Sequence, residues 1–155
     1  MSAPGTTRPF AVFIDSSVLF AAALSPTGGA RELLQQGFQG RVALYISTLV
    51  LQEVERNITR KASAALPAFQ MLRDLLPLQL IEPSTEVIEQ VAASIERKDA
   101  PIVAAAISAG AGYLATHDVK HLLRQASQVE LDFGLIITTP GDLLTRLRAS
   151  STTSP

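Results

Sequence analysis

Short apolar runs alternate with helix-compatible stretches along almost the whole chain. Five runs have the length of a strand, at 10–14, 42–46, 78–81, 113–115 and 135–138. The runs are apolar rather than alternating, which is typical of strands whose sheet is covered by helices on both faces. Strands that are separated by helices pair in parallel. The pattern therefore predicts an α/β fold, a three-layer α/β/α sandwich around a parallel sheet of about five strands.

The stretches between these runs carry helical signals. Helices are expected at 17–24, 30–38, 48–61, 64–76, 84–95, 99–109, 119–126 and 140–148. Ser47 or Thr48 can cap the third helix, and Ser84 can cap the fifth. Pro101 suits the first turn of the sixth helix, and Gly110 suits its end.

The composition fits a single domain. With 155 residues, of which 47% are hydrophobic, the chain can bury a substantial core. We expect this domain at 10–148, between a flexible leader at 1–9 and a disordered tail at 149–155. The chain has no cysteine, no apolar stretch of about 18 residues and no signal-peptide core. Thiolate chemistry is excluded, no membrane association is expected, and a cytoplasmic location is predicted.

The charge balance argues against a broad surface for nucleic acids. The chain carries 13 basic and 14 acidic side chains, for a formal net charge of −1. A positive field over the whole protein is therefore not expected. Local basic patches or a bound metal ion would have to supply any attraction for phosphates.

Four carboxylates are placed where a ligand would bind. Asp15 follows the first apolar run and Asp118 comes shortly after the fourth, and open α/β sheets bind ligands beyond the carboxyl ends of their strands. Glu53 and Asp99 lie on helices that would enter from the same edge. Each acid also has a simpler interpretation: a helix N-cap for Asp15, Asp99 and Asp118, and a solvated helix residue for Glu53.

A cluster of these acids would need a cation. Carboxylates that lie close together repel one another and raise one another's pKa. Oxygen ligands alone favour a hard divalent ion, Mg²⁺ or Mn²⁺, over zinc. Such an ion neutralises phosphate charge and activates water, which is the chemistry of phosphodiester hydrolysis.

Four segments in order along the chain place the acids in a recurring pattern: "VFIDSSVLFAAALSPTGGARELL", "LYISTLVLQEVERNI", "KDAPIVAAAISAGAGYLATHDVKHLL" and "LIITTPGDLLTRL". These segments resemble the PIN-domain nucleases, especially the VapC-like toxins of bacterial toxin–antitoxin pairs. Together they cover roughly residues 11 to 148. The resemblance implies a parallel sheet with strand order 3-2-1-4-5.

The same resemblance implies a function and a set of site residues. The function is a metal-dependent endoribonuclease that acts on single-stranded RNA, with an antitoxin protein as partner and a homodimer or higher homo-oligomer as its assembly. The implied catalytic and metal-binding residues are Asp15, Glu53, Asp99 and Asp118. Ser16 would support the first acid, and Thr116 would orient the loop before Asp118.

Several positions around the acids have open interpretations. Lys120 stands where close relatives often carry another acid, and glycine is common where His117 stands. His117 and His121 could act as general bases or phosphate ligands, or could be surface residues without a role. The cations considered for contact with RNA are Lys120, Lys98, Arg97 and Arg31.

Other classes of protein compete with the nuclease hypothesis. A PIN-like scaffold that binds protein or RNA without catalysis would keep the acids for stability alone. A phosphoacceptor signalling domain would need adjacent acids after the first strand and a lysine after the fifth, and a phosphatase would need an acid at Ser17. The segments "DSS" and "TTP" do not match these requirements.

Overall fold

The structure, a computed structural model, describes residues 10–152. The predicted leader at 1–9 and the end of the predicted tail at 153–155 lie outside the described residues. The strands are β1 (Phe10–Ile14), β2 (Val42–Ile46), β3 (Leu78–Leu80), β4 (Tyr113–Ala115) and β5 (Ile136–Thr138). They form one parallel sheet in the order β3-β2-β1-β4-β5, so the predicted fold class and strand order are confirmed.

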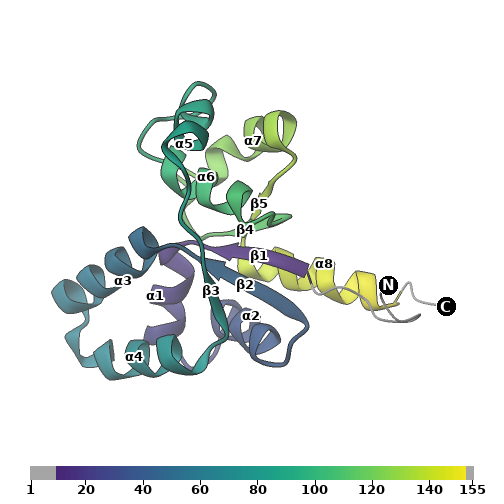
Figure 1. Ribbon diagram of the computed structural model, residues 1–155. Helices are drawn as coiled ribbons and strands as arrows, with labels where there is room; N and C mark the ends of the chain where they lie inside the picture. The colour runs from purple at the N-terminus through teal and green to yellow at the C-terminus, as the bar shows by residue number, and fades with distance from the viewer. Residues whose placement is uncertain (1–9, 153–155) are drawn as a thin grey trace.

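Helices cover both faces of this sheet, as the apolar character of the strands predicts. The helices are α1 (Ser16–Leu24), α2 (Gly29–Phe38), α3 (Thr48–Lys61), α4 (Leu66–Leu75), α5 (Thr85–Ala92), α6 (Ala100–Ser108), α7 (Ala126–Phe133) and α8 (Pro140–Thr152), with short 3₁₀ helices η1 (Ser63–Ala65) and η2 (Leu123–Gln125). In Figure 1, α1 to α4 lie below the sheet and α5 to α7 lie above it. Helix α8 packs against α2. None of the helices in the described residues could cross a membrane.

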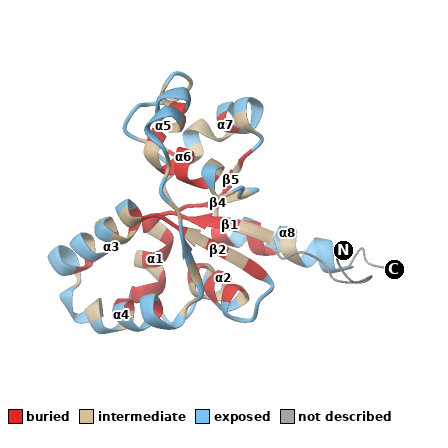
Figure 2. Cartoon of the chain, viewed as in Figure 1, coloured by how far each residue is buried: buried red, intermediate tan, exposed pale blue. Residues whose placement is uncertain are grey.

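The core lies between the sheet and the inner faces of the helices (Figure 2). The middle of β1 is fully buried, and five consecutive residues of α6, from Ile102 to Ala106, are buried as well. Alanines allow α6 to approach the sheet closely. A similar constraint holds at Gly37 on α2, where an added Cβ would lie 2.2 Å from the Leu44 side chain of β2.

The register of the central strands places the site. Ile14 of β1 pairs with Ala115 of β4, so both strands end at the same level. The next residue of each strand, Asp15 and Thr116, therefore stands at the same edge of the sheet. The backbone N–H of Asp15 donates to the Ala115 carbonyl at 3.0 Å and continues the ladder by one residue.

The helix predicted at 119–126 is wrong. Residues 119–122 form turns rather than a helix, and the helix that follows begins at Ala126. The side chain of Asp118 accepts from the backbone N–H of His121, which holds the chain in a turn there. Gly134, in the left-handed conformation with φ 71°, ends α7 and is the stop signal that the prediction did not use.

The ends of two other helices also differ from the prediction. Helix α5 ends at Ala92 instead of Ile95. Helix α8 continues to Thr152, so the expected disordered tail is helical at 149–152. The hydroxyls of Ser150 and Ser151 donate to the carbonyls four residues earlier, so both polar side chains bond within the helix itself.

Candidate active site

A cleft of about 330 Å³ opens beyond the carboxyl ends of β1 and β4. All four acids singled out in the sequence line it, namely Asp15, Glu53, Asp99 and Asp118. The other lining residues are Ser16, Ser17, Phe20, Asn57, Lys61, Lys98, Ile102 and Leu122. Residues more than 100 positions apart in the sequence thus meet at one edge of the sheet, although their catalytic and metal-binding roles stay predictions.

Asp15 is the most buried of the four acids, with 5% of its surface exposed. It occupies the N-cap position of α1, yet its side chain makes no capping hydrogen bond. Instead, its Oδ2 atom accepts hydrogen bonds from Ser17 Oγ at 2.8 Å and from Thr116 Oγ1 at 2.7 Å. The simpler interpretation of Asp15 as a helix cap therefore does not explain its side chain.

Thr116 connects two of the acids. Its side chain is fully buried, donates to Asp15, and accepts from the backbone N–H of Asp118 at 2.9 Å. Ser17 makes a parallel link, because its hydroxyl accepts from the backbone N–H of His117 at 2.9 Å. The loop after β4 is thereby tied to the start of α1.

Glu53 lies half-buried on α3 and faces two of the other acids. Burial raises the pKa of the Glu53 carboxyl, and the negative charge of Asp15 raises it further, with a smaller contribution from Asp118. A hydrogen bond with Ser16 and the charge of Arg56 lower this pKa in part. A raised pKa is the expected signature of carboxylates that converge without a cation.

The two serines at the start of α1 act on different acids. The hydroxyl of Ser16, the residue expected to support the first acid, lowers the pKa of Glu53. The hydroxyl that supports Asp15 belongs to Ser17. One step along a helix rotates a side chain by about 100°, so adjacent serines serve different acids.

Asp99 and Asp118 are each held by one oxygen. Asp99 stands at the N-cap position of α6 without a capping hydrogen bond, and its Oδ2 accepts from Gln125 Nε2 at 2.9 Å. The Oδ1 atom of Asp118 accepts from the backbone N–H of His121 at 3.1 Å. Asp118 thus stabilises a turn, close to its simpler interpretation, and keeps its other oxygen for another partner.

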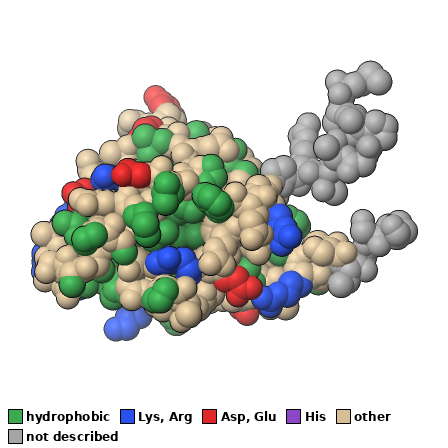
Figure 3. Space-filling view, turned by 90° about the horizontal axis from the view of Figure 1, so that it is seen from below, with side chains coloured by type: hydrophobic (Ala, Val, Ile, Leu, Met, Phe, Trp, Pro, Cys, Tyr) green, Lys and Arg blue, Asp and Glu red, His purple; other side chains and the backbone are tan. Residues whose placement is uncertain are grey.

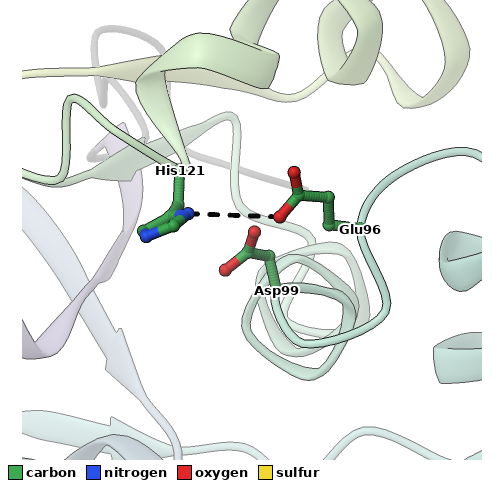
Figure 4. Close-up of side chains that lie close together, drawn as sticks. All are labelled: Glu96, Asp99 and His121. Carbon is green, nitrogen blue, oxygen red and sulfur yellow. Dashed lines mark ion pairs between the residues drawn. The ribbon is translucent and has the colours of Figure 1, made fainter.

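Asp99 also belongs to a second group of potential ligands, together with Glu96 and His121 (Figure 4). Among the described residues, ligand atoms within 4.8 Å of one another are found in Glu96, Asp99 and His121. The Lys98 ammonium lies 2.8 Å from His121 Nδ1 and 3.9 Å from Glu96 Oε2. A cation of the chain itself already serves this group, so its need for a metal is small.

The donor set of the cleft fits a hard divalent ion. Four carboxylates line it, no cysteine exists in the chain, and the pKa of Glu53 is raised by burial and then by the charge of Asp15, which a cation would offset. Of the four carboxylates, Asp99 alone belongs to the group of described residues whose ligand atoms lie within 4.8 Å of one another. The other three carboxylates are therefore spaced more widely in the described structure than the ligands of a preformed tight site.

The cations considered from the sequence are distributed differently from the expectation. Lys98 lines the cleft, but Arg97 pairs with Glu89 and Arg31 donates to the Ala22 carbonyl. Lys120 is exposed and does not line the cleft. Sequence reasoning missed four residues of the site: Ser17, Asn57, Lys61 and Gln125. The spacing of Asn57 and Lys61, four and eight residues after Glu53, was the available signal.

The sequence model of the PIN domain matches residues 11–120, well over half of the chain. The chain therefore belongs to the PIN-domain family, and this membership supports a nuclease. The sheet order agrees with the earlier resemblance.

Solved structures share this fold at low sequence identity. PAE2754 from Pyrobaculum aerophilum aligns with a TM-score of 0.63 and 20% identity over 90% of this chain and 96% of that protein. VapBC2 from Rickettsia felis, bound to a DNA fragment from its promoter, aligns with a TM-score of 0.61 and 15% identity over 84% of this chain and 98% of that chain. DNA-bound VapBC from Salmonella typhimurium gives a TM-score of 0.61 and 16% identity, over 84% of this chain and 98% of that chain. The sequence has no significant match among curated proteins.

Proposed function

We propose that this protein is a divalent-metal-dependent endoribonuclease that hydrolyses phosphodiester bonds in single-stranded RNA. The observation that carries the proposal is the convergence of Asp15, Glu53, Asp99 and Asp118 on one cleft at the carboxyl edge of a parallel sheet. Membership of the PIN-domain family supports the nuclease class. The choice of RNA and of Mg²⁺ or Mn²⁺ follows from the resemblance and from the all-oxygen donor set.

The four carboxylates would hold the ion. When bound, a divalent ion neutralises the charge of the scissile phosphate and lowers the pKa of the attacking water. The chain's own contribution is to position these carboxylates. Ser17 and Thr116 fix one oxygen of Asp15, and Gln125 fixes one oxygen of Asp99. Because Thr116 also accepts from the Asp118 backbone, one buried hydroxyl sets the relative positions of two acids.

Asp15→Asn tests the assignment. This variant keeps the shape of the side chain and removes its charge, so it should abolish Mn²⁺-dependent cleavage of single-stranded RNA while circular dichroism stays unchanged. The wild-type products should carry a 5′-phosphate and a 3′-hydroxyl. Asp74→Asn is the matched control, because Asp74 is an exposed acid on α4 whose ion pair within residues 10–152 is with its neighbour Arg73. Full activity of Asp15→Asn would contradict the proposal.

A non-catalytic scaffold that binds protein or RNA is the second candidate, and one feature favours it. An apolar groove of about 460 Å³ lies between α2 and α4, where Phe38 and Leu75 are more than 60% exposed. Figure 3, which views the molecule from below, shows hydrophobic side chains gathered on this side. Calorimetry with Mn²⁺ separates the two functions. A scaffold has no need for metal affinity, whereas the nuclease must bind Mn²⁺ and lose that binding in Asp15→Asn.

The groove and the likeness to VapBC structures also support a partner protein. We propose that the nuclease is the cytoplasmic toxin of a toxin–antitoxin pair, and that the antitoxin covers its cleft and groove. We further propose a homodimer or higher homo-oligomer with contacts through the early helices. Co-expression with the product of the neighbouring gene should yield a complex, and Phe38→Glu should weaken it. A protein that expresses freely and always purifies alone would argue against the pair.

A further inference from the structure

Helix α3 presents three different polar side chains to the cleft. Glu53, Asn57 and Lys61 are spaced four residues apart and all line it. Residues at this spacing share one face of a helix. The face therefore runs from a carboxylate near Asp15 to a cation at the last residue of α3.

Lys61 differs from the other lysine of the cleft. The Lys98 ammonium contacts His121 and Glu96. By contrast, Lys61 makes no ion pair or side-chain hydrogen bond within residues 10–152, and the Asn57 amide makes none there either. An exposed cation and an adjacent free amide are thus available at the margin of an otherwise acidic cleft.

We infer that Asn57 and Lys61 bind the sugar–phosphate backbone of an RNA strand beside the scissile phosphate, an inference that rests on the proposed function. The Lys61 ammonium would pair with a phosphate, and the Asn57 amide can donate to a phosphate oxygen or contact a 2′-hydroxyl. Eight residues of helix separate Lys61 from Glu53 by about 12 Å, roughly three stacked nucleotides. The contact therefore lies on a flanking part of the strand, where it offsets the repulsion between phosphates and acids.

The chain supplies a matched control beside Lys61. Arg60 is the next residue back and carries the same charge, but it faces a different surface groove together with Gln52 and Thr59. Lys61→Met and Arg60→Met therefore change the net charge equally, on the same turn of the same helix. Only the first variant removes a cation from the cleft.

The test measures binding in the Asp15→Asn background. The affinity of full-length protein for a labelled oligouridylate is determined by fluorescence anisotropy over a series of KCl concentrations at low, fixed Mg²⁺. Lys61→Met should reduce the slope of log K against log salt by about 0.7 and weaken binding about fivefold near 0.1 M salt. Asn57→Ala should weaken binding without changing the slope, and Arg60→Met should change neither quantity.

Each outcome decides the inference. Equal slopes for Lys61→Met and Arg60→Met would overturn it, as would failure of the parent protein to bind the oligonucleotide, provided that circular dichroism shows folded protein. The proposed nuclease function stands or falls on a separate result, Mn²⁺-dependent cleavage by the wild type and its loss in Asp15→Asn. A selective loss of salt dependence in a protein that never cleaves would keep the backbone contact and reject the nuclease.

Discussion

The acids beside β1 and the neighbouring group of Glu96, Asp99 and His121 are held in different ways, and we call these two regions the inner and the outer side. On the inner side, Asp15 is buried and is held by the hydroxyls of Ser17 and Thr116, and no lysine or arginine of the described residues forms an ion pair with it. On the outer side, Glu96 is exposed and lies within 4.0 Å of Lys98, His121 and Arg124.

This difference indicates where an external cation is needed. Hydroxyl donors fix the position of a carboxylate but leave its negative charge in place, whereas lysine and arginine neutralise it. The unmet need for positive charge therefore lies on the inner side, between Asp15 and Glu53. The outer side, although its ligand atoms are closer together, already contains cations of the chain.

The largest change in stability is expected when the inner side loses its central hydroxyl. Thr116→Val removes the hydrogen bond to Asp15 and leaves the Asp118 N–H without its acceptor. A buried polar group without a partner costs about 1–3 kcal/mol, so the free energy of unfolding should fall by roughly 2 kcal/mol. Urea denaturation measures the loss, and RNA cleavage should fall with it.

Thr138→Val is the control for this prediction. Thr138 is also a buried threonine at the end of a strand, but the one side-chain hydrogen bond of its hydroxyl within the described part of the chain is a 3.5 Å contact with the Thr139 carbonyl. Its replacement should cost less than about 1 kcal/mol. Similar losses for both variants would show that Thr116 contributes packing rather than the connection between two acids.

The position of the inner side could be predicted from the sequence, because short apolar runs and helical spacing identify the strands and the helices. The apolar runs at 10–14, 42–46 and 113–115 match β1, β2 and β4 residue for residue. Once β1 and β4 are neighbours in a parallel sheet, residues that follow their ends must meet. The acids of both strands and the buried Thr116 could therefore be placed without coordinates.

The remaining parts of the site depend on features that spacing does not determine. The phase of α1 decides whether Ser16 or Ser17 reaches Asp15. Gln125 reaches Asp99 across 26 positions, because turns at 119–122 replace the predicted helix. Lys61 could have been found from its spacing to Glu53, but only after the face of α3 that meets the cleft was known.

A smaller change in stability is expected from Glu53→Gln, and this change depends on pH. The folded-state pKa of Glu53 is raised, mainly by burial and then by Asp15. The folded protein therefore binds this proton more tightly than the unfolded chain, and stability falls as pH rises from the unfolded pKa through the folded pKa. In EDTA, Glu53→Gln should remove this decline and be more stable than the wild type at neutral pH.

Thermal unfolding in EDTA and in Mn²⁺ checks whether Glu53→Gln is more or less stable than the wild type. Because a ligand stabilises the state that binds it, Mn²⁺ should raise the melting temperature of the wild type more than that of Glu53→Gln. The difference in stability between the two proteins should then become smaller or change sign. A variant that is less stable in EDTA at neutral pH would mean that Glu53 is not under electrostatic strain.

The smallest effect is expected on the outer side. Glu96→Gln weakens exposed ion pairs with Arg124 and Lys98, and such pairs typically contribute about 0.2–1 kcal/mol. Its unfolding free energy should therefore change by no more than about 0.5 kcal/mol, and RNA cleavage should stay close to that of the wild type.

Calorimetry provides the decisive measurement, because Glu96 would be a direct ligand if Mn²⁺ bound to Glu96, Asp99 and His121. A loss of Mn²⁺ affinity on the order of tenfold or more in Glu96→Gln would move the metal to the outer side and reverse the comparison. Unchanged affinity in this variant, together with its loss in Asp15→Asn, would place the ion beside Asp15, whose carboxylate is held by hydroxyls rather than by an ion pair.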